Sequence, residues 1–122
     1  MSHRTSTAFA IDVLAVLVFV AIGRRSHDET GNVVAGALVV AAPFLIAAAL
    51  GWFITRAWRD PFSIRSGAPI WVSTVVIGLL LRKFVFDRGT ATAFVIVATI
   101  TLGMMIVGWR ALAAIRTARI TR

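Results

Sequence analysis

One uncharged stretch, residues 33–55, constrains this chain more than any other feature of its sequence. It reads VVAGALVVAAPFLIAAALGWFIT and contains no Asp, Glu, Lys or Arg. A helix needs about 20 apolar residues to cross a hydrocarbon core roughly 30 Å thick. The stretch is therefore long enough to cross a membrane by itself, with some length left for tilt.

The composition of the whole chain agrees with a membrane environment. Hydrophobic residues make up 59% of the 122 residues and charged residues 15%, which is too little polar surface for a soluble domain of this size. The net charge of +8 comes from basic residues at the ends of apolar runs, so it predicts contact with anionic lipid headgroups rather than with nucleic acid. No Cys is present, which excludes disulfides and thiolate metal sites, and we expect neither a metal nor a cofactor.

Three further apolar runs predict three more spans, so the expected fold is all-α. The single domain, residues 1–122, has predicted spans at about 8–23, 33–55, 68–86 and 90–109. Pro61, Gly67 and Pro69 are expected to break any helix between the second and third spans.

The third span is the weakest of the four. Its uninterrupted apolar part, residues 70–81, would form a helix only about 18 Å long. It spans the membrane if the helix continues to about Phe86, with Arg82 and Lys83 reaching outward. The alternative is a re-entrant or interfacial segment.

Four spans place both termini on one side of the membrane. That side carries 8 of the 13 basic residues, and the positive-inside rule then predicts a plasma-membrane protein with cytoplasmic termini. All four tryptophans are also expected at this interface, where the indole ring favours the headgroup layer: Trp52, Trp58, Trp71 and Trp109.

The two halves of the chain share a pattern that suggests a 2+2 parallel hairpin repeat. The first and third spans end in paired basic residues, Arg24-Arg25 and Arg82-Lys83, and the second and fourth end in Gly-Trp followed by Arg. Parallel repeats of this kind occur in transporters. The alternative is that the bilayer imposes the same interface chemistry on any two hairpins.

Asp12 is the most informative single residue, because an acid inside a span is costly and usually faces a partner. Arg56 and Arg110 end neighbouring spans at a similar depth, so an intramembrane ion pair is the first interpretation. A second is a proton- or cation-coupling acid of a transporter. A third is a side chain that simply reaches the headgroup layer.

Charged residues also gather at the opposite membrane face. The candidates are Arg24, Arg25, His27, Asp28, Arg82 and Lys83. The acids are expected to neutralise the basic residues and hold the two outer loops together. A pocket for an anionic lipid headgroup is the intermediate interpretation, and a metal site is disfavoured because adjacent residues rarely converge on one ion.

Small residues recur four positions apart in three spans, ending at Gly51, Gly78 and Gly103. Such pairs let helices approach closely, either inside the bundle or against a partner protein. Pro43 lies near the middle of the second span, where neighbouring helices must compensate for the missing N–H.

Several of these features together resemble a known family. They are the run from Asp12 to Gly23-Arg24-Arg25-Ser26-His27, Pro43-Phe44, Gly51-Trp52, and the Trp71, Thr74-Val75, Gly78, Leu81-Arg82 pattern. The chain resembles, over nearly its whole length, small four-helix membrane proteins of actinobacteria and haloarchaea catalogued as a domain of unknown function (number 3054). The resemblance implies a four-span bundle in the plasma membrane and implies no activity.

Two functions remain open at this level. The first is a non-enzymatic accessory or stabilising subunit of a larger plasma-membrane complex, such as a lipid or solute transport system, with an unlike membrane protein as partner. The alternative is a small homo-oligomeric transporter or channel in which Asp12 couples a proton or cation. No nucleophile–base arrangement occurs in the sequence, so no enzymatic activity is expected.

Overall fold

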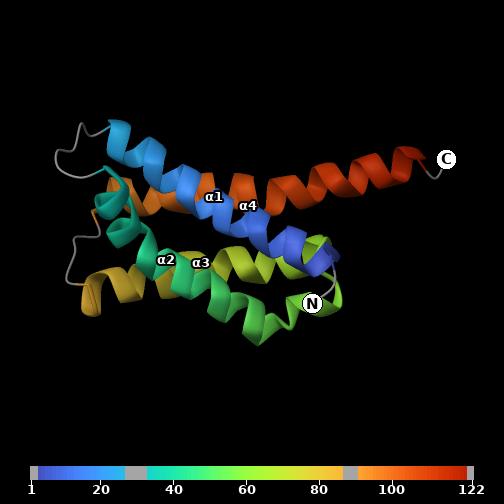
Figure 1. Cartoon of the computed structure of the whole chain (residues 1–122), viewed down its shortest axis with the longest axis horizontal. Coiled ribbons are helices and arrows are strands. Elements are labelled where there is room, and N and C mark those ends of the chain that lie inside the picture. The colour runs from blue at the N-terminus through green and yellow to red at the C-terminus, as the bar shows by residue number, and fades with distance from the viewer. Residues whose placement is uncertain (1–2, 27–32, 87–90, 121–122) are drawn as a thin grey trace.

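The computed structural model describes residues 3–26, 33–86 and 91–120, and these form an all-α bundle. The helices are α1 (His3–Ser26), α2 (Val33–Thr55), α3 (Ile64–Phe84) and α4 (Thr92–Ile120), with a 3₁₀ turn η1 (Ala57–Arg59) between α2 and α3. Helix α1 packs against α2 and α4, and α3 packs against the same two helices. Helix α1 begins and α4 ends at the same end of the bundle, here termed the terminal end (Figure 1).

All four helices are long and apolar enough to cross a membrane. Large apolar side chains cover their outer surfaces, including Phe53 at 74% exposure and Met104 at 72%. Exposing such a surface to water would be energetically unfavourable, whereas exposing it to lipid tails would not. The prediction of a multi-pass, all-α membrane bundle is therefore confirmed.

Helix α3 begins earlier than its predicted start near residue 68. Ser63 caps the helix by accepting a hydrogen bond from the Ser66 N–H at 3.2 Å, and Gly67 and Pro69 then lie inside the helix. The expectation that these two residues break the helix was wrong: Pro69 removes only the hydrogen bond to the Arg65 carbonyl, and membrane helices tolerate such a gap where neighbouring groups compensate. The resulting 21-residue helix covers about 31 Å, enough for a full span.

Helix α4 is longer than its predicted span of 90–109. The basic segment after Trp109 continues the same helix to Ile120, and its last part runs past the ends of the other three helices (Figure 1). Alanine and arginine make up most of this segment and are good helix formers, which explains the continuation.

An aromatic cluster fills the half of the bundle remote from the terminal end. Phe19, Phe44 and Phe94 lie with ring centroids 5.9–6.1 Å apart, and they come from α1, α2 and α4. Helix α3 completes the cluster with Gly78, whose missing side chain leaves the space that Phe44 fills. Helix α2 continues through the buried Pro43 beside this cluster.

Candidate functional site

Asp12 and Arg110 form a buried ion pair near the terminal end of the bundle. Two parallel hydrogen bonds join them: Arg110 Nη1 donates to Asp12 Oδ1 and Arg110 Nη2 to Asp12 Oδ2, each at 2.8 Å. The two side chains are 1% and 0% exposed. Two-pronged arginine–carboxylate contacts are among the strongest hydrogen-bonded pairs in proteins.

Two indole N–H groups complete the coordination of the carboxylate. Trp52 Nε1 on α2 donates to Oδ2 at 2.8 Å, and Trp109 Nε1 on α4 donates to Oδ1 at 2.9 Å. Each carboxylate oxygen thus accepts one bond from Arg110 and one from a tryptophan. The charge of Asp12 is balanced without access to water.

Arg110 also donates to the loop between α2 and α3 and to its own helix. Its Nε donates to the carbonyl of Pro61 at 2.9 Å, and its Nη1 also donates to the carbonyl of Ile106, one turn earlier in α4, at 3.0 Å. The aliphatic part of Arg110 lies against Gly67 of α3, where an added Cβ would be only 2.5 Å from Arg110 Cδ. A glycine is required there for the guanidinium to reach Asp12.

These contacts connect every helix of the bundle. Asp12 belongs to α1, Trp52 to α2, Gly67 to α3, and Trp109 with Arg110 to α4. A carboxylate that couples transport must exchange a proton or cation with a water-accessible path, and this one is enclosed by four donors from the protein. The geometry favours a structural lock, in which the pair joins the four helices, over a coupling group.

Arg56, the other predicted partner of Asp12, is not part of this network. It is exposed, lies in the left-handed region with φ 52°, and begins the turn η1. Helix α2 ends just before it, so its side chain is not carried inward by a helix face. Arg110, in contrast, lies in the middle of a continuous helix whose inner face it occupies.

The roles of Trp52 and Trp109 were missed by sequence reasoning, which placed them in the headgroup layer. Trp52 is only 5% exposed, and both indoles donate to Asp12 instead. Trp71 donates to the Thr99 carbonyl inside the bundle at 2.8 Å, while Trp58 is exposed at the terminal end. The similar depth of Asp12, Trp52 and Trp109 in their spans was the only available signal.

Little of the predicted outer charge cluster can be followed in space. His27 and Asp28 lie outside the described residues, and Arg24 and Arg25 are described only as the last turn of α1. The guanidinium of Arg82 lies 4.2 Å above the Phe94 ring, and Lys83 is exposed beside Phe84. Within the described part of the chain, no three His, Asp or Glu residues approach one another closely enough to hold a metal ion.

The three predicted packing glycines all face side chains of a neighbouring helix in the same chain. Gly51 faces Ser73 on α3, Gly78 faces Phe44 on α2, and Gly103 faces the Trp71 ring on α3. Each would place an added Cβ within 3 Å of a neighbouring side chain. These positions therefore serve contacts between helices of one chain, and Gly103, which is half-buried, also lines a hollow between α3 and α4.

No curated protein and no solved structure matches the chain. One family does match: its description is "protein of unknown function (DUF3054)", and the match covers residues 9–113. This region includes Asp12, Trp52, Gly67, Trp109 and Arg110, and it spans most of the chain. This chain, a four-helix membrane bundle that contains a buried Asp12–Arg110 pair, is thus a member of the DUF3054 family.

Proposed function

We propose that this protein is a non-enzymatic accessory subunit of a larger plasma-membrane assembly, such as a lipid or solute transport system. In this proposal both termini are cytoplasmic, and an unlike membrane protein contacts the outer surface of the bundle. The chain supplies a rigid transmembrane body rather than a transport path.

One observation carries the proposal: the carboxylate of Asp12 is fully enclosed. Four donors hold its two oxygens, and the side chain is 1% exposed. Removing one partner of a buried ion pair commonly costs several kcal/mol, so a cycle that released Arg110 in every turnover would have to offset that loss. A structural role needs no such compensation.

The shape of the bundle also supports a non-transporting role. Its interior is filled by the Phe19, Phe44 and Phe94 cluster at one end and by the ion pair at the other. In the part of the chain that the structure describes, the large hollows lie on the outer surface. The hollow between α1 and α4, for example, is lined mainly by apolar side chains. A solute path would need polar groups along the interior.

Gentle extraction tests the accessory role. The full-length chain with an affinity tag is purified from its native membrane in a mild detergent or directly in lipid particles, and the co-purified proteins are identified by mass spectrometry. We expect an unlike membrane protein in a fixed ratio to this chain. A four-span protein with the same tag, expressed at the same level, controls for non-specific recovery.

The alternative, a homo-oligomeric transporter, gives a different outcome. Recovery of this chain only with copies of itself would contradict the accessory role. Proton- or cation-dependent flux in vesicles that disappears in the folded Asp12→Asn variant would contradict it as well. If the native protein shows no flux in vesicles, the result supports a structural role for Asp12.

A further inference from the structure

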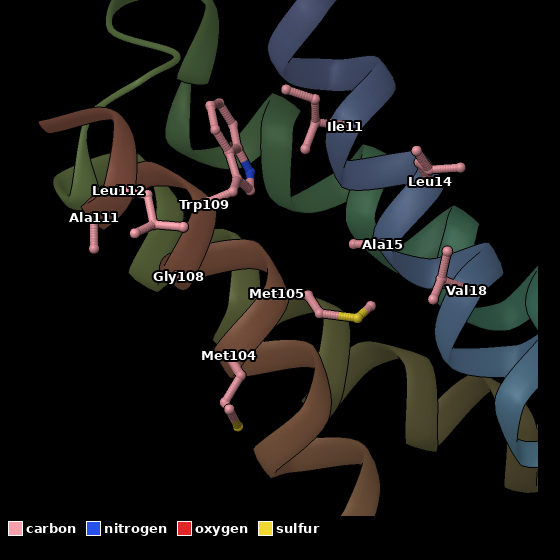
Figure 2. Close-up of a pocket in the computed structure, with 10 residues that line it drawn as sticks. All are labelled: Ile11, Leu14, Ala15, Val18, Met104, Met105, Gly108, Trp109, Ala111 and Leu112. Atoms are coloured by element: carbon pink, nitrogen blue, oxygen red, sulfur yellow. The ribbon is translucent and has the colours of Figure 1, made fainter. Parts of the chain in front are cut away.

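An open apolar groove runs between α1 and α4 on the outer surface of the bundle (Figure 2). It has a volume of about 570 Å³. Met105 points from α4 toward α1 and forms part of its floor (Figure 2). The residues that line this α1/α4 groove are Ile11, Leu14, Ala15, Val18, Met104, Met105, Gly108, Trp109, Ala111 and Leu112.

A second hollow continues the groove toward the terminal end, and it is basic. Leu112 lines both, and the second is completed by Arg4, Phe62, Ala113, Arg116 and Thr117. The guanidinium of Arg4 is held 4.2 Å above the ring of Phe62, which in turn packs edge-on against Trp109. Arg4 is therefore positioned by Phe62, which packs on Trp109, one of the two indoles that donate to Asp12.

The length of this combined surface matches one leaflet of a bilayer. Arg4 and Val18 are 14 helical steps apart on α1, or about 21 Å, and one leaflet with its headgroup layer is about 20–22 Å thick. The apolar groove thus reaches roughly from the middle of the membrane to the headgroup level, where the two arginines lie.

We propose that the α1/α4 groove binds an anionic glycerophospholipid from the leaflet at the terminal end. One acyl chain lies between Leu14 and Met105, and the phosphate contacts Arg4 and Arg116. Guanidinium groups suit this ligand because their planar N–H groups match the oxygens of a phosphate.

The charges around the headgroup position favour an anion over a zwitterion. Arg4 and Arg116 both line the polar end of the groove, and Arg119 lies one turn beyond Arg116. Asp60 is the acid on this face, and it lines a neighbouring hollow together with Arg4. The two arginines that line the groove therefore outnumber this one carboxylate, and the net charge at the phosphate position is positive.

Native mass spectrometry of the full-length chain, released from detergent micelles, tests the site. The protein is titrated with phosphatidylglycerol or with phosphatidylcholine of the same acyl chains, and the bound fractions are compared. The native protein is expected to retain phosphatidylglycerol preferentially. In the Arg4→Gln/Arg116→Gln variant, affinity for phosphatidylglycerol is expected to fall about 30-fold, from about fivefold for each arginine near a membrane surface.

A matched charge control uses Arg59→Gln/Arg65→Gln. Both arginines are exposed at the terminal end but do not line the groove, so phosphatidylglycerol binding should change little in this variant. A matched shape control compares Leu14→Trp, which fills the groove, with Ile100→Trp, which fills the hollow between α3 and α4. Only the first should weaken binding, because Leu14 and Ile100 are similarly exposed, at 57% and 56%, but only Leu14 lines the groove.

Three results would overturn the proposal. Equal retention of the two lipids by the native protein would remove the headgroup preference. An equal loss in the Arg59→Gln/Arg65→Gln control would reduce it to general surface charge. A Leu14→Trp variant that loses a protein partner or self-association while retaining phosphatidylglycerol would identify the occupant as a helix. The first two results do not depend on whether the accessory role is correct.

Discussion

At the scale of single residues, Asp12 and Arg110 each depend on the other for a partner that balances a buried charge. Both side chains are almost completely buried, and the nearest alternative partner for Asp12 predicted from the sequence, Arg56, is exposed elsewhere. Losing one partner leaves an uncompensated charge inside the membrane, which is far more costly than losing both. The pair should therefore be strongly coupled in stability measurements.

Asp12→Asn and Arg110→Gln test this coupling. Each substitution alone is expected to lower the free energy of unfolding by about 3–5 kcal/mol, because it leaves a buried unpaired charge. The double variant should lose much less than the sum, since two amides carry no charge and the amide oxygen introduced by Asp12→Asn can still accept a bond from an indole. Unfolding by SDS titration in mild-detergent micelles, followed by circular dichroism, measures these losses.

Arg56→Gln is the matched control for Arg110→Gln. Arg56 ends a neighbouring span, carries the same charge and is exposed, so its loss should change the free energy of unfolding by less than about 0.5 kcal/mol. Equal effects of the two substitutions, or simple additivity in the double variant, would show that the ion pair is not the lock described above.

The sequence could predict that Asp12 needs a partner but not which arginine provides it. Arg56 and Arg110 have similar depth and similar neighbours in the sequence. The choice depends on how each helix is rotated about its axis and on the space left by Gly67, neither of which hydropathy describes. The same limit explains why Trp52 and Trp109 were assigned to the headgroup layer, since depth alone cannot separate an interface from a buried site at equal height.

At the scale of helices, close approach depends on glycines that face large side chains. Gly78 of α3 lies against the fully buried ring of Phe44, and an added Cβ would be 2.5 Å from Phe44 Cδ1. The ring cannot move freely, because Phe19 and Phe94 pack around it. Helices α2 and α3 would have to separate to admit a methyl group.

Gly78→Ala is therefore expected to lower the free energy of unfolding by about 1–3 kcal/mol through overpacking. Gly108→Ala is the matched control, because Gly108 also lies within a helix but an added Cβ would meet nothing within 4 Å. Alanine there should be neutral or stabilising by up to about 1 kcal/mol, the difference in helix propensity. A loss at Gly108 as large as that at Gly78 would assign the effect to backbone changes rather than to the Phe44 contact.

Helix number and approximate position followed from the sequence, whereas the ends of α3 and α4 did not. An uncharged run such as residues 33–55 has one favourable environment and one favourable conformation, so α2 was predicted with its observed bounds. Charged and proline-containing segments have no such constraint. The Ser63 cap begins α3 before Gly67 and Pro69, and good helix formers continue α4 into its basic segment. Hydropathy describes neither of these local causes.

At the scale of the whole molecule, the buried pair also changes the charge balance that predicts orientation. Arg110 was counted among eight basic residues of the terminal side, against five on the other. Because Asp12 neutralises it inside the bundle, seven remain to interact with headgroups or the cytoplasm. The sign of the difference still favours cytoplasmic termini, but its size is small.

Ala91→Cys and Ala118→Cys test this orientation without altering any charge. Both positions are exposed, they lie near opposite ends of α4, and the chain has no other cysteine to react. In intact cells, a membrane-impermeant maleimide should label the Ala91→Cys variant and not the Ala118→Cys variant, while both should react after lysis. The reverse pattern would place the termini outside, and equal labelling in intact cells would mean that α4 does not cross the membrane. Because α4 carries Arg110, that last result would also place the Asp12–Arg110 pair outside the hydrocarbon core, where the energetic case for a lock is much weaker.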